Sequence, residues 1–194
     1  MKHFSEYVDS AERVMDAAQA LIQQRGYNGF SYDDIAKVVG IKKPSIHHHF
    51  ATKGDLVAVV TQRYVHRFRE HLLRIEGQHA KAPDRLRAYG VLFEQTYHAD
   101  RHCLCGMLGA EADGLPAQVR DELSLFFSVN VDWLSSVIEA GQQAKQLTGS
   151  SPARYIAQTY LCALEGALAV GRGMREAQGP AALGEVLIDA LART

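Results

Sequence analysis

Apolar residues recur at intervals of three and four along most of the chain, which is the spacing of one face of an α-helix. The first such stripe runs from Val8 to Ile22 and is followed by Gly26, a residue that can close a helix in the left-handed conformation. No long alternating or β-branched run bounded by turn residues indicates a strand. The pattern therefore predicts an all-α protein of about nine helices.

Capping residues and prolines indicate where the predicted helices begin. Ser31 with Asp34, and Thr52 with Asp55, have the spacing of capping boxes. A proline opens each of the later apolar stripes, as the first position of a helix allows: Pro83, Pro116, Pro152 and Pro180. We expect one helix from Lys53 to about Glu76, followed by helices at about 83–99, 103–112, 116–147, 152–175 and 180–192.

The segment between residues 31 and 50 has the order helix, tight turn, helix. A helix-turn-helix needs a small residue at the contact, a residue that tolerates positive φ in the turn, and an apolar residue that fixes the second helix to the core. Ala36, Gly40 and Ile46 occupy these positions. Many helical hairpins share this pattern, so the distribution of charged residues is needed to indicate a DNA-binding helix-turn-helix.

Positive charge is concentrated on this segment. From residue 37 to residue 53 the sequence holds four lysines and no acid, whereas the rest of residues 1–60 holds three cations and seven acids. Contacts to DNA phosphates require such a local excess of positive charge. The excess must be local, because the net charge of the whole chain is −1.

Composition sets the class of protein. The chain has 194 residues, 47% hydrophobic and 22% charged, a balance typical of a globular protein with a core. No apolar run is long enough to cross a bilayer, and the opening residues lack the apolar region of a secretory signal. We therefore expect a cytoplasmic protein, without membrane partners, in which Cys103, Cys105 and Cys162 are thiols.

The stretch from Phe30 to Leu56 resembles the DNA-binding segment of the tetracycline-repressor (TetR) family. The likeness rests on Asp34-Ile35-Ala36, the Gly40-Ile41 turn, Ser45 before Ile46-His47, the His49-Phe50 pair and Lys53, and it covers about residues 8–60. It implies a homodimeric repressor that a small-molecule effector releases from a palindromic operator. Residues 1–52 would form the DNA-binding domain and 53–194 the ligand-binding and dimerisation domain, joined by helix 53–76.

The resemblance also implies the DNA contacts. The side chains that would face bases or phosphates are Ser31, Tyr32, Lys42, Lys43, Ser45, His47, His48, His49 and Lys53. The family commonly has tyrosine at the positions of His47 and His49. A protonated imidazole adds charge, so we expect operator affinity to rise as the pH falls from about 7.5 toward 6. Alternatively, the three imidazoles only face solvent and make no DNA contact. A metal site built from all three is disfavoured, because the side chains of consecutive helical residues do not converge on one ion.

Large side chains at helical spacing in the C-terminal region either fill a core or line an effector pocket. The candidate pocket residues are Tyr89, Phe93, Tyr97, Cys103, Cys105, Met107, Glu111, Phe127, Trp133 and Tyr160. The phenols and Glu111 would provide polar contacts. These residues suit a small effector that is aromatic or otherwise apolar and at most weakly polar, and no cofactor is expected.

Three hypotheses fit the segment from His98 to Met107, which holds two histidines and Cys103-Leu-Cys105. The thiols are packed as small apolar groups, or one of them is a reactive thiolate that senses electrophiles or oxidants. In the third hypothesis His98, His102 and the two cysteines bind zinc, although adjacent His102 and Cys103 are awkward ligands for one ion.

Small and apolar residues at helical spacing predict a dimer interface on helices 152–175 and 180–192, although an internal core explains the same pattern. Two other classes of function compete with a DNA-binding regulator. An enzyme would use the Cys/His segment, but the sequence has no Ser-His-Asp order and no nucleotide-binding glycine loop, so we expect no enzyme. A purely structural helical module leaves the lysine-rich segment unexplained.

Overall fold

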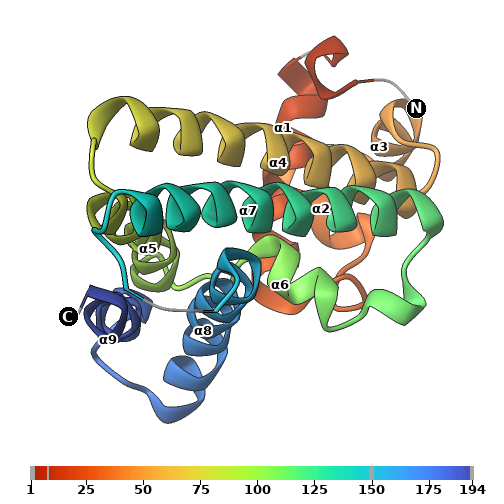
Figure 1. The fold of residues 1–194 in the computed structure, drawn as a ribbon. Helices are drawn as coiled ribbons and strands as arrows, with labels where there is room; N and C mark the ends of the chain where they lie inside the picture. The colour runs from red at the N-terminus through yellow and green to blue at the C-terminus, as the bar shows by residue number, and fades with distance from the viewer. Residues whose placement is uncertain (1–2, 8, 149–150, 193–194) are drawn as a thin grey trace. The chain divides into compact units, whose positions relative to one another are not determined.

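The computed structural model describes residues 3–7, 9–148 and 151–192. Within these ranges the chain is helical and contains no strand, which confirms the all-α prediction (Figure 1). The α-helices are α1 (Asp9–Arg25), α2 (Tyr32–Val39), α3 (Lys43–His49), α4 (Lys53–Gln78), α5 (Ala82–His98), α6 (Leu104–Gly109), α7 (Ala117–Gln143), α8 (Ala153–Met174) and α9 (Pro180–Ala192). Two short 3₁₀ turns, η1 (Phe4–Glu6) and η2 (Ala112–Gly114), complete the described elements. Val8 lies outside the described residues.

The predicted helix signals act as expected at the start of the chain. Ser31 and Asp34 form a reciprocal capping box, and the backbone N–H of Thr52 donates to the Asp55 carboxylate at 3.0 Å. Gly26 and Gly40 both have φ of +74°, the left-handed conformation expected of them.

Three helix ends differ from their approximate predicted positions by two to four residues. Helix α4 continues through Gly77, α6 ends at Gly109 rather than 112, and α7 ends at Gln143 rather than 147. Gly141 explains the last difference. The backbone N–H of Leu147 donates to the Gly141 carbonyl at 3.1 Å, and the Leu147 side chain occupies the space that a Cβ on Gly141 would need.

The chain forms two compact units. The first unit comprises residues 1–67 and 104–126, and the second comprises residues 68–103 and 127–194. These units do not coincide with a division after residue 52, because the first half of α4, α6 and the start of α7 belong to the first unit. None of the described helices is long and apolar enough to cross a membrane.

The first unit packs α1, α2 and α3 around the beginning of α4. Every residue from Leu56 to Val60 is fully buried, as is Ile46 of α3. A helix that is apolar on all sides must be covered on all sides. Gln118 and Glu122 on α7 contact this part of α4, through hydrogen bonds to Asp55 and Gln62.

The core of the second unit is a cluster of aromatic rings, which we call the aromatic cluster: Phe68, Tyr89, Phe93, Trp133 and Tyr160. The ring of Tyr89 lies at its centre, with ring centroids 5.4 to 6.2 Å from those of the other four. Its hydroxyl donates to Asn130 Oδ1 at 2.8 Å, so each of these two buried polar atoms has a hydrogen-bond partner.

Candidate nucleic-acid interface

The turn between α2 and α3 holds the two helices in fixed relation. The backbone N–H groups of Gly40 and Ile41 both donate to the Ala36 carbonyl, at 2.9 and 3.2 Å, and the left-handed Gly40 redirects the chain. Arg13 on α1 donates to the Val39 carbonyl at 2.6 Å. Because α3 is anchored by the fully buried Ile46, its opposite face is left for solvent or for a ligand.

That outer face carries the predicted contact residues. Lys42, Lys43, Ser45, His47 and His48 are all exposed. The Lys43 ammonium lies 2.9 Å from the Asp33 carboxylate, an exposed ion pair of small energetic value. No ion pair to Lys42 occurs among the described residues, so its charge is available to a phosphate.

The three histidines have different surroundings. The Nδ1 of His47 lies 3.2 Å from the Ala51 carbonyl; because a carbonyl oxygen only accepts, this nitrogen carries the proton. The exposed Nε2 of His47 is then an acceptor in the neutral ring and a donor in the charged one. His49 is half-buried and its Nε2 lies 2.9 Å from the Ser10 hydroxyl.

Two of the expected phosphate-contact residues have side chains that bond within the first unit. The Tyr32 side chain is buried and its hydroxyl donates to the Phe50 carbonyl at 3.0 Å; burial raises the pKa of this phenol well above its usual value. The Lys53 ammonium donates to the Phe30 carbonyl and lies over the rings of Tyr27 and Phe30. Burial lowers the Lys53 pKa. Tyr32 is buried and Lys53 is half-buried, and each side chain satisfies a backbone carbonyl at a helix junction.

Comparison with known proteins identifies the segment. Residues 14–60 match the model of the family described as bacterial regulatory proteins, tetR family. A crystal structure of a TetR-family transcriptional regulator from Agrobacterium tumefaciens is 32% identical, with a TM-score of 0.87, over 95% of this chain and 98% of that one. The chain belongs to the TetR family.

Other relatives agree with this membership. A TetR transcriptional regulator from Legionella pneumophila is 26% identical, with a TM-score of 0.85, over 95% of this chain and 98% of that one. The biofilm operon negative transcriptional regulator IcaR of Staphylococcus epidermidis is 33% identical over 63 residues, 32% of this chain. That match spans about a third, 34%, of IcaR. TetR-family proteins are transcriptional regulators and not enzymes, so we assign this chain to the DNA-binding regulators.

Glu111 has a role that the sequence did not indicate. It was expected in the effector pocket, but its carboxylate accepts from the backbone N–H groups of Tyr27 and Asn28, both at 3.0 Å, and from the Asn28 side-chain amide at 2.6 Å. A Cβ on Gly26 would lie 2.0 Å from its Oε1. Glu111 therefore fixes the turn after α1, and Gly26 is the residue that lets it approach.

Most of the other expected pocket residues pack into this TetR-family fold. The rings of Phe93, Trp133 and Tyr160 each contact the ring of Tyr89 in the aromatic cluster. The Tyr97 hydroxyl donates to the Glu176 carbonyl at 2.7 Å. The remaining four lie in different units: Cys103 and the half-buried Phe127 in the second, and Cys105 and the half-buried Met107 in the first.

The Cys/His segment does not form a metal site in the structure. No group of three or more His, Cys, Asp or Glu side chains is placed to bind a metal among the residues described. His98 is exposed and bonds Glu94 at 2.8 Å. Cys103 and Cys105 are buried free thiols, and the Cys103 thiol is hydrogen-bonded to the buried carboxyl of Glu165 on α8. Burial raises the pKa of Glu165 to about 7.

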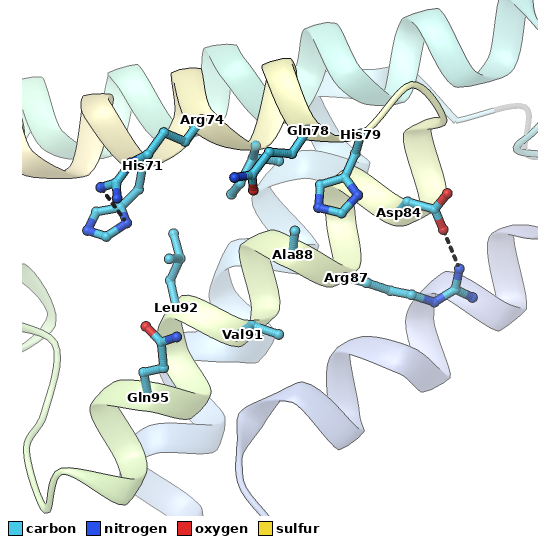
Figure 2. Close-up of a pocket in the computed structure, with 11 residues that line it drawn as sticks. His71, Arg74, Gln78, His79, Asp84, Arg87, Ala88, Val91, Leu92 and Gln95 are labelled. Atoms are coloured by element: carbon cyan, nitrogen blue, oxygen red, sulfur yellow. Dashed lines mark hydrogen bonds and ion pairs between the residues drawn. The ribbon is translucent and has the colours of Figure 1, made fainter.

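Two hollows lie on the second unit. A groove of about 520 Å³ between the end of α4 and α5 is lined by residues outside the expected pocket set (Figure 2). A smaller one of about 240 Å³, between α8 and α9, includes Tyr160.

Proposed function

We propose that this chain is a homodimeric repressor that binds a palindromic operator through α3 and is released by a small-molecule effector. The observation that carries the proposal is the outer face of α3, where lysine, serine and histidine side chains are exposed and no acid interrupts them. A seven-residue helix anchored by one buried isoleucine fits the major groove, with its side chains at the base edges. The description of IcaR as a negative regulator supports repression.

The proposed dimer surface is the exposed face of α8 and α9. The opposite face of α8 is buried within the second unit, so an internal core accounts for only part of the apolar pattern. The exposed apolar side chains are Tyr155, Val170, Met174, Leu183 and Val186, of which Tyr155 is 66% exposed. Apolar residues exposed on neighbouring helices favour burial against a second copy of the chain.

A thiol sensor of the same fold is the second candidate, and the contact between Cys103 and Glu165 favours Cys103 as its reactive residue. When ionised, the Glu165 carboxylate can act as a general base that accepts the thiol proton as the sulfur attacks an electrophile. Cys103→Ser should abolish release of DNA by an electrophile such as methylglyoxal, while Cys105→Ser should leave it intact. Equal release in the Cys103→Ser variant would remove this candidate.

Operator binding tests the main proposal directly. Duplexes selected by the full-length protein from a random library should contain two inverted half-sites whose centres lie one helical turn apart or a multiple of it. The affinity for the selected duplex should fall steeply as salt rises, since phosphate contacts release counterions. A library from which no inverted repeat is enriched would contradict the proposal.

Dimerisation needs its own test. Sedimentation equilibrium should give twice the chain mass of 21.4 kDa. Val186→Glu places a charge on the α9 surface, where the side chain is 64% exposed, and should yield monomers that remain folded. Val38→Glu is the matched control, because Val38 is 66% exposed on α2 in the first unit. A monomeric wild-type protein would contradict the proposed dimer.

A further inference from the structure

The groove between α4 and α5 has one apolar side and two polar ends. Ile75, Ala88 and Leu92 provide its apolar lining, and Val91 lies at its exposed edge. Its volume of about 520 Å³ is within the range of small-molecule sites. The polar ends differ in charge, as Figure 2 shows: His71 and Arg74 lie at one end, and Asp84 and Arg87 at the other.

The end of the groove near Arg87 is already neutralised. The Arg87 guanidinium donates to both carboxylate oxygens of Glu185, at 2.7 to 3.0 Å, and to Asp84 at 3.3 Å. With two carboxylates on one guanidinium, this end has no positive charge to offer an anionic ligand.

The other end of the groove carries the hydrogen-bond donors of Arg74 and His71. Arg74 donates from its Nη2 to Nδ1 of His71 at 3.1 Å. Because a guanidinium cannot accept, this Nδ1 is unprotonated and the neutral ring carries its proton on Nε2. Burial and the neighbouring Arg74 lower the His71 pKa, which agrees with a neutral ring. The Glu70 carboxylate acts on the His71 pKa in the opposite direction, and Glu70 does not line the groove.

We propose that this groove binds an organic carboxylate with an apolar body, its carboxylate held by Arg74 and the Nε2–H of His71. The guanidinium supplies charge-assisted hydrogen bonds, and the imidazole N–H adds a second donor. The apolar body lies over Leu92 and Ala88. This site is separate from the helix-turn-helix, and binding to it is measured without DNA, so its failure would leave the proposed repressor function untouched.

Isothermal titration calorimetry of the full-length protein with decanoate tests the site. Decanoate should bind, acetate should not, and affinity from hexanoate to decanoate should rise by up to about fourfold per methylene. Decyltrimethylammonium, which has the same tail and the opposite charge, should not bind. Equal binding of the cation and the carboxylate would overturn the proposal.

Two variants test the contact with the carboxylate and the space for the apolar body separately. Arg74→Gln should weaken decanoate binding at least about tenfold, because a charge-assisted pair is lost. Arg69→Gln, an exposed arginine on the same helix outside the groove, is the matched control and should bind as wild type does. Ala88→Trp fills the groove and should abolish binding with both charges kept. Unchanged binding in Arg74→Gln or in Ala88→Trp would overturn the site.

Discussion

The outer face of α3 and the aromatic cluster were both expected to bind ligands, and their side chains are arranged in opposite ways. On α3, polar side chains stand exposed on a helix that one buried isoleucine anchors. In the cluster, four rings lie around the fully buried ring of Tyr89, whose hydroxyl donates to Asn130 Oδ1. Exposed polar groups on a rigid support indicate a binding surface, whereas aromatic residues at helical spacing indicate a core first.

The largest expected effect tests whether the cluster is core. Tyr89→Ala removes a fully buried ring from its centre and should lower the free energy of unfolding by about 4 kcal/mol. Tyr89→Phe should cost only about 1–2 kcal/mol, the penalty of losing the hydrogen bond from the Tyr89 hydroxyl to Asn130 Oδ1. Urea denaturation measures both. His48→Ala on the exposed face of α3 is the control, with an expected change within about 0.5 kcal/mol. A comparably small loss in Tyr89→Ala would contradict a core role for this ring and favour an effector pocket.

A second experiment concerns Glu165, the buried acid of the second unit. The Glu165 pKa of about 7 in the folded state lies above its ordinary 4.5, so the folded state resists ionisation of this group. Stability should therefore fall as the pH rises from about 4.5 to 7 and then level off. Glu165→Gln lacks this loss and should gain about 3 kcal/mol relative to wild type between pH 4.5 and 8. Parallel stability curves for the two proteins would contradict the buried carboxyl.

The third experiment tests whether the turn after α1, at Gly26, is held by the Glu111 carboxylate. Gly26→Ala places a side chain at φ of +74° and forces the Glu111 carboxylate away, so it should cost about 2 kcal/mol in thermal or urea unfolding. Gly77→Ala is the matched control. Its Cβ would meet nothing within 4 Å, and alanine in a helix should stabilise by about 0.5–1 kcal/mol. Equal effects of the two substitutions would mean that the turn is not constrained.

The smallest expected effect concerns a phosphate contact. Lys42→Ala should weaken operator binding by about tenfold and reduce the slope of log affinity against log salt by about 1. Lys81→Ala, an exposed lysine before α5, should change neither quantity. Anisotropy of a labelled duplex at several salt concentrations gives both numbers. Loss of affinity with the slope unchanged would assign Lys42 a different role.

The first unit could be predicted in detail because its signals are local. Capping boxes at Ser31 and Thr52 and the left-handed glycines act within a few residues, so spacing alone places them. The hydrogen bonds of the Tyr32 and Lys53 side chains were missed because they reach carbonyls up to 23 residues away.

The candidate effector residues could not be sorted from sequence. Periodicity places Glu111 and Tyr89 on helices, but it does not say that one caps the turn after α1 and the other pairs with Asn130. The α4–α5 groove was missed for the opposite reason. Arg74 and His71 look like ordinary surface residues in the sequence, and only the structure shows that they are hydrogen-bonded to each other and line the groove.

The central claim, that α3 reads DNA, is tested most directly by specificity rather than affinity. The ratio of affinities for the selected duplex and for an unrelated duplex should be measured with wild type and with a Ser45→Ala, His47→Ala double variant. Loss of base contacts should lower this ratio by at least about tenfold while binding to the unrelated duplex stays unchanged. An unchanged ratio would mean that another part of the chain reads the operator.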